Sequence, residues 1–175
     1  QIGFGMTAFH AGSMLLVYMA GNLAMKSATT AVLRRYGFRN VLTVNGAICA
    51  ATLFGCGLLS PGDPLPLMCV LLFVAGMARS MNFTAISTLA FADVPDEIRA
   101  GGSTLGTLLQ QVSLALGVAL GAMVPGASQA LRGAPAVELA DFRHAWYVVG
   151  LLMAIATLMT LRLDRQAGMA VSRRS

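Results

Sequence analysis

Five long apolar segments constrain this chain more than any other feature. They cover about residues 6–33, 41–59, 65–90, 103–124 and 145–161. A bilayer core about 30 Å thick needs about 20 apolar residues in a helix that rises about 1.5 Å per residue. Only helices and closed barrels satisfy every backbone polar group in lipid, and barrel strands would be about ten residues long with alternating polarity. The sequence therefore predicts an all-α membrane protein with five transmembrane helices.

The composition supports this fold class and excludes others. Of the 175 residues, 57% are hydrophobic and only 11% are charged, whereas a soluble chain carries about 25% charged residues. So few charged residues cannot cover the surface of an ordinary soluble enzyme, and so many hydrophobic residues exclude a disordered chain. The three cysteines lie within apolar segments, which favours packing over disulfides or a metal site. Phosphate-loop, HExxH and nucleophile-elbow motifs are absent, so we expect no enzyme, metal or cofactor.

The positions of the basic residues predict the orientation. Arg132 and Arg143 lie on one side of the predicted spans, and eight arginines lie on the other: Arg34, Arg35, Arg39, Arg99, Arg162, Arg165, Arg173 and Arg174. The positive-inside rule places these eight in the cytoplasm. We therefore expect a multi-pass protein of the plasma (inner) membrane, with the first residues outside and the C-terminal tail inside. This distribution assigns the basic charge to membrane loops rather than to nucleic-acid binding.

Two cations lie within the predicted spans, and no acidic residue does. Charges inside a membrane are costly enough to mark candidate functional sites. Arg79 lies near the middle of the third span, and helical spacing places Asn82 on its face. We interpret both as lining a cavity in which Arg79 binds an anionic group or couples to a carboxylate elsewhere. Alternatively, Arg79 is a structural residue satisfied by carbonyl groups or a polar neighbour.

A polar stripe follows the first span, where Tyr18, Asn22 and Lys26 recur every four residues. Such a stripe must avoid lipid, so it faces other helices or a water-filled cavity. These three residues are further candidates for the substrate cavity. The alternative is ordinary helix packing, with Lys26 extending toward the cytoplasmic surface.

Small residues mark one side of the fourth span, at Gly106, Gly117 and Gly121. Such residues let two helices approach closely, so we predict that this side packs against another helix. Gln110 lies beside it and is either a packing residue or a contact to the substrate. In the second span, a weakly polar stripe predicts packing: Asn45, Cys49, Thr52 and Cys56.

Three stretches resemble the C-terminal half of a major facilitator superfamily transporter, in the branch of fourteen-span drug:proton antiporters. Residues 33–39, Leu-Arg-Arg-Tyr-Gly-Phe-Arg, resemble the C-half copy of the superfamily's cytoplasmic loop motif. Arg35, Gly37 and Arg39 match that motif, whereas Arg34 stands where it has aspartate. Residues 91–101 are similar to the branch's loop before its penultimate span, and residues 110–121 resemble the Gln- and Gly-rich segment that follows.

The resemblance implies a six-helix C-terminal bundle without its first helix, so the chain is interpreted as a piece of a longer protein. In such transporters, two related halves rock around a midplane site. The implied function is proton-coupled efflux of amphipathic or drug-like small molecules. Protons would pass through the missing N-terminal part, and the implied partners are the lipid bilayer and the substrate. The alternatives are a carrier of a sugar, an organic anion or a siderophore, or a membrane scaffold that does not transport.

Overall fold

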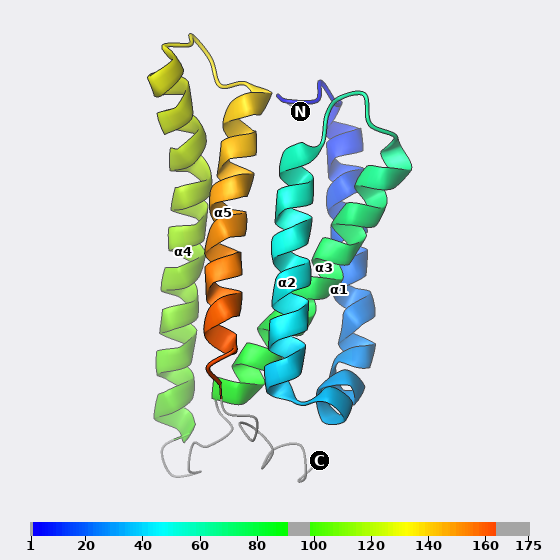
Figure 1. Cartoon of the computed structure of the whole chain (residues 1–175), viewed down its shortest axis with the longest axis vertical. Helices are drawn as coiled ribbons and strands as arrows, with labels where there is room; N and C mark the ends of the chain where they lie inside the picture. Colours follow the sequence, from blue (N-terminus) through cyan, green and yellow to red (C-terminus); the bar gives the residue numbers. More distant parts are fainter. Residues whose placement is uncertain (1, 91–98, 164–175) are drawn as a thin grey trace.

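Five long helices make up almost all of the computed structural model, which describes residues 2–90 and 99–163. They are α1 (Ala8–Tyr36), α2 (Phe38–Leu58), α3 (Leu65–Ala90), α4 (Arg99–Arg132) and α5 (Leu139–Thr160). Each is long and apolar enough to cross a membrane. The described residues contain no strand. Figure 1 shows the helices running alongside one another, with α3 tilted behind α2. The expected all-α membrane fold is confirmed.

Local signals in the sequence explain where several helices begin and end. The Thr7 side chain accepts a hydrogen bond from the His10 backbone N–H and caps α1. Gly37 separates α1 from α2 with a φ of 75°, and its N–H donates to the Leu33 carbonyl at 3.0 Å. Gly133 ends α4 with a φ of 63°. Glycine adopts this left-handed conformation without the steric cost that a Cβ brings.

The loop between the last two helices is shorter than the sequence suggested. The sequence predicts a fourth span that ends at residue 124, directly before Pro125 and Gly126, but α4 continues through Pro125 to Arg132. Membrane helices tolerate an internal proline when neighbouring groups accommodate the freed backbone carbonyl. The fifth helix begins at Leu139 rather than near residue 145. As a result Asp141 is a helical residue in the first turn of α5, rather than part of a loop.

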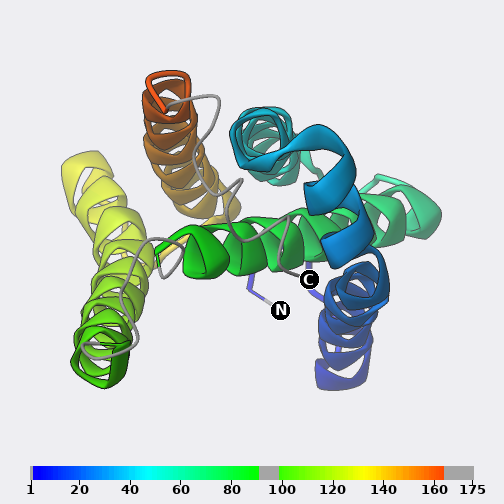
Figure 2. The same cartoon turned by 90° about the horizontal axis from the view of Figure 1, so that it is seen from below.

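The helices pack in a series in which α3 contacts α1 and α2, while α2 also packs on α5. Figure 2 shows α2 and α5 on one side of α3, with the beginnings of α1 and α4 toward the other side. The turn between α1 and α2 carries Arg34, Arg35 and Arg39 and is called the basic turn below. The main apolar cluster lies near it, where α1, α2 and α3 meet, and consists of Leu33, Phe38, Val41, Leu42, Met81 and Ala85. Helix α4 packs mainly on α5.

Glycines allow the closest helix contacts, but not those that the sequence suggested. A Cβ at Gly21 of α1 would overlap the Phe73 carbonyl, and one at Gly76 of α3 would overlap the Tyr18 carbonyl. The two backbones therefore touch, which only glycine permits. At Gly117 and Gly121 a Cβ would meet nothing within 4 Å. The expected packing of these two residues is not found within the described chain.

Two further glycines also show where the close contacts are. A Cβ at Gly46 of α2 would overlap Thr157 of α5, and one at Gly57 would lie 2.6 Å from the Tyr147 ring. Gly106 of α4 is half-buried. The spacing of small residues thus shows that a helix face can accept a close contact with another helix. It does not show which helix, if any, makes that contact within the described chain.

Candidate functional site

An exposed stripe follows the side of α3 that α1 and α2 leave uncovered. It contains Arg79, Phe83 and Ile86, and the two apolar side chains are 52% and 57% exposed. These positions share one face of the helix by their three- and four-residue spacing. Arg79 is 14 residues from Leu65 and 11 from Ala90, so it lies about 21 Å and about 17 Å from the two ends. A cation is therefore exposed near the middle of a helix that packs on both α1 and α2.

Asn82 does not share this exposed surface. It is buried against α2, and its Nδ2 donates a hydrogen bond to Cys49 Sγ at 3.3 Å. Its Oδ1 is buried and finds no hydrogen-bond partner among the described residues. Side chains three residues apart on a helix point in directions about 60° apart. This rotation places Asn82 within the α2 interface and leaves Arg79 outside it.

The rest of the α2–α3 interface is also polar. Asn45 Nδ2 donates to the Ala78 carbonyl at 2.7 Å, and Thr52 Oγ1 donates to the Cys49 carbonyl at 2.9 Å. Asn45 and Cys49 of the polar stripe therefore face α3, whereas Cys56 lies beside residues of α5 such as Phe142 and Trp146.

The other predicted cavity residues lie in three different environments. Tyr18 and Asn22 are half-buried where α1 crosses α3, and the Asn22 nitrogen would lie 3.0 Å from a Cβ at Gly76. Gly76 is less than one turn from Arg79, so these residues lie close along the helix axis. Lys26 is exposed farther along α1, and Gln110 is exposed on α4. No cluster of metal-binding side chains occurs in the described ranges.

The basic turn connects three helices. Arg39 Nη2 donates to the Leu161 carbonyl at 2.7 Å, which joins the start of α2 to the end of α5. The Arg35 guanidinium lies 5.5 Å from the centre of the Tyr36 ring, in the range of a cation–π contact. Gly37 supplies the bend between the two arginines. The three motif residues therefore fix the shape of this turn.

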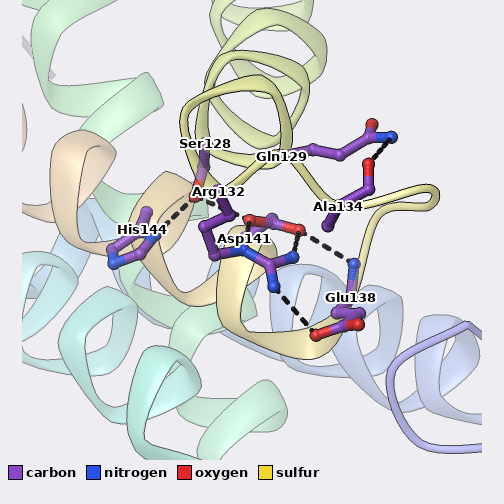
Figure 3. A network of polar contacts seen from close by, with 7 residues as sticks. All are labelled: Ser128, Gln129, Arg132, Ala134, Glu138, Asp141 and His144. Carbon is purple, nitrogen blue, oxygen red and sulfur yellow. Dashed lines mark hydrogen bonds and ion pairs between the residues drawn. The ribbon is translucent and has the colours of Figure 1, made fainter.

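A polar network joins α4 to α5 at the opposite end of the bundle (Figure 3), and the sequence reasoning missed it. Asp141 is completely buried, and each carboxylate oxygen accepts two hydrogen bonds. Ser128 Oγ and Arg132 Nε donate to Oδ1, while Arg132 Nη2 and the Glu138 backbone N–H donate to Oδ2. A buried carboxylate is tolerated when its oxygens are paired in this way.

Two more side chains complete the network. Arg132 Nη1 donates to Glu138 Oε2 at 3.0 Å, and the Ser128 hydroxyl lies 2.8 Å from His144 Nδ1. Because the single hydroxyl proton of Ser128 is donated to Asp141, His144 Nδ1 must carry the proton in its bond to Ser128. His144 had no predicted role. The acidic pair three residues apart, Glu138 and Asp141, was the available signal for a helix start here.

Comparison with known proteins decides the family. A family model described as Major Facilitator Superfamily matches residues 1–174. The chain belongs to this superfamily. The resemblance drawn from the loop and Gln-rich stretches is thus confirmed, and so is a multi-pass membrane protein with the fold of a superfamily fragment.

Relatives within the superfamily narrow the comparison to one group. The chain is 31% identical over 165 residues to the putative multidrug resistance protein MdtD of Serratia proteamaculans, covering 93% of the chain and 34% of that protein. It is 30% identical over 181 residues to the MdtD protein of Citrobacter koseri, covering 99% of the chain and 38% of that protein. The chain thus spans little more than a third of these relatives. No solved structure matches it.

Proposed function

We propose that this chain is part of a secondary active transporter that exports amphipathic or drug-like small molecules in exchange for protons. The superfamily membership and the multidrug resistance relatives support this function. The observation that carries it is the exposed Arg79 near the middle of α3. A guanidinium facing lipid at that depth would be costly, so Arg79 needs water, a substrate or an acidic partner beside it. A cation in the wall of a substrate pathway would meet this requirement.

The five helices form, in this proposal, a C-terminal six-helix half without its first helix. Each half of these transporters contains two related three-helix units. If α3, α4 and α5 form the second unit, the first unit contains α1, α2 and one preceding helix. Because α3 packs on α1 and α2, the equivalent preceding helix would pack on α4 and α5. The exposed apolar surface of α4 supports this arrangement.

The proposed orientation places the basic turn in the cytoplasm of a cell with an inner membrane. Proton coupling normally needs an embedded carboxylate or histidine. Asp141 is a poor candidate because all four hydrogen-bonding positions of its carboxylate are occupied. The coupling acid is therefore proposed to lie in the part of the transporter outside this chain, and vesicles containing only residues 1–175 should not transport.

The test compares Arg79→Gln with Arg162→Gln, an exposed arginine beyond the end of α5. The full-length protein in proteoliposomes with a proton gradient should lose at least about tenfold in efflux rate with Arg79→Gln, the factor produced by ~1.4 kcal/mol. Arg162→Gln should transport normally. Unchanged efflux with Arg79→Gln would make Arg79 a structural residue and remove the main support for the proposal.

The positive charge of Arg79 specifically favours one other substrate class, an organic anion. Assays with a cationic dye and with an aromatic carboxylate separate the two substrate classes. Efflux of the dye supports drug export, whereas movement of only the carboxylate identifies an anion carrier. For either substrate class, the change in transport rate caused by Arg79→Gln tests whether Arg79 acts in transport.

A further inference from the structure

An open apolar groove of about 360 Å³ lies between α1 and α2, close to the basic turn. Figure 1 shows that turn at the lower end of both helices. Val44 and Ile48 of α2 line the groove and remain 62% and 40% exposed. Two methionines, Met25 and Met81, contribute flexible side chains that adapt to irregular apolar ligands. The groove thus offers an apolar binding surface that the described chain leaves uncovered.

The length of the groove matches one leaflet of a membrane. Along α1 it extends from Met25 to Tyr36, which is about 17 Å at the rise of a helix. Half of a hydrocarbon core is about 15 Å thick. A single acyl chain that starts at the membrane surface therefore reaches the inner end of the groove.

The open end of the groove is polar and positively charged. Tyr36 and Asn40 line it there, both exposed, and the Arg35 guanidinium lies over the Tyr36 ring. Arg39 donates to the Leu161 carbonyl at the end of α5, and Arg35 is the cation that lies against a residue lining the groove. The groove thus combines an apolar channel of leaflet length with hydrogen-bond donors and one positive charge at headgroup depth.

We propose that this groove binds an anionic phospholipid of the inner leaflet. One acyl chain lies against Val44, Ile48 and the two methionines, while the phosphate contacts Arg35, with Tyr36 and Asn40 beside it. The proposal uses the orientation given above, with the basic turn in the cytoplasm, and does not depend on the transported substrate. Clusters of basic residues at the cytoplasmic ends of membrane helices attract anionic lipids, at about 1 kcal/mol per cation.

Two other occupants fit the groove less well. A further transmembrane helix is about 10 Å wide and would leave Arg35 next to apolar side chains. A cationic drug-like substrate would meet Arg35 at the opening and be repelled by it. The exposed stripe with Arg79 lies elsewhere, on the face of α3 that α1 and α2 leave uncovered, whereas Met81 of α3 faces this groove.

The experiment uses photoreactive lipids in nanodiscs containing the full-length protein. Phosphatidylglycerol and phosphatidylcholine carry the same diazirine-labelled acyl chain, and mass spectrometry locates the labelled residues. We expect phosphatidylglycerol to label the groove about fivefold more than phosphatidylcholine, since one cation contributes about that factor. Both lipids should label the exposed surface of α5 around Leu151 equally.

Matched variants test the two ends of the groove. Arg35→Gln should remove the preference for phosphatidylglycerol. Arg34→Gln should keep it, because two residues along a helix turn the side chain about 200° from the groove residue Val32. Val44→Trp should fill the groove and prevent labelling by both lipids, whereas Leu151→Trp on the exposed face of α5 should not affect groove labelling.

Three results would overturn the proposal. Equal labelling of the groove by both lipids would make it an ordinary boundary surface without headgroup preference. Labelling of α5 but not of the groove would show that a protein segment or another ligand covers it. A preference for phosphatidylglycerol that survives Arg35→Gln would place the charge recognition elsewhere. Reduced labelling of α5 in Arg35→Gln would show that this variant is misfolded. The test then rests on the lipid preference of the wild-type groove and on the two tryptophan variants.

Discussion

Helices α3 and α4 are almost equally hydrophobic, yet they occupy opposite environments. Their most apolar windows have mean hydropathies of 1.5 and 1.6, but 33% of that window is buried in α3 and none in α4. The difference lies in shape, because Gly76 lets α3 touch the backbone of α1 while Gly117 and Gly121 of α4 face open space. Lipid is as apolar as leucine, so hydropathy identifies a membrane helix without showing which face packs.

The substitution Gly76→Ala should disrupt the close contact between α3 and α1. The added Cβ overlaps the Tyr18 carbonyl, and a backbone atom cannot move aside as a side chain can. We expect the free energy of unfolding to fall by about 3 kcal/mol, at the upper end of the usual cost of overpacking. Denaturant unfolding in detergent micelles measures it.

Gly117→Ala is the matched control on α4. Its Cβ meets nothing within 4 Å, and alanine favours a helix by up to about 1 kcal/mol over glycine. In a protein of residues 1–175 alone, which lacks the preceding helix proposed to pack on α4, we therefore expect unchanged or slightly increased stability. An equal loss of stability in both variants would contradict the comparison, because it would mean that the glycine side of α4 also packs against protein.

The sequence predicted the membrane helices well because lipid imposes a strict requirement on length and polarity. The bounds of α3 coincide with the predicted segment 65–90, where Pro64 and the turn before it form a clear break. The end of α4 could not be predicted in the same way. Pro125 is a helix breaker in water, but its effect inside a membrane depends on neighbouring groups that only the fold supplies.

The polar network explains how α4 stays attached without close glycine contacts. Asp141→Asn should loosen α4, because an amide offers one acceptor oxygen and turns its own N–H donors toward Arg132 or the Glu138 N–H. We expect the second largest destabilisation, seen as faster hydrogen exchange of backbone amides in the last turn of α4. Amides in α3, which packs on other helices, should exchange at their usual rates.

Glu138→Gln provides the control for that network. The Glu138 side chain is 62% exposed, pairs with Arg132 and accepts from the Asp141 backbone N–H in the cap of α5. Glutamine keeps an acceptor oxygen for that cap and loses only the surface charge, so the change should have little effect. Exchange accelerated equally in both variants would show that the buried carboxylate has no special role. Exchange unchanged in both would show that α4 is held by apolar contacts alone.

The candidate site could be predicted only in part. Arg79 was identified because a charge inside an apolar segment is visible in the sequence, and whether it contacts substrate stays a prediction. The burial of Asn82 was not visible, since 60° of rotation around a helix decides between an open face and the α2 interface. Asp141 was missed because hydropathy assigned its segment to a loop, although its partners on α4 bury it completely.

The smallest expected effect concerns Asn82, and it separates packing from function on α3. Asn82→Leu removes one weak bond to Cys49 Sγ and a buried oxygen that has no partner among the described residues. Leaving such an oxygen unpaired costs free energy, so its removal offsets the lost bond and stability should change by less than about 1 kcal/mol. Asn45→Leu loses a 2.7 Å bond to the Ala78 carbonyl and should cost about 1 kcal/mol.

Measuring stability and efflux together is decisive here. If Asn82→Leu is stable but inactive, we infer that the Asn82 oxygen finds its partner during transport. Normal efflux would leave Asn82 a packing residue and Arg79 the exposed polar residue of this turn to test.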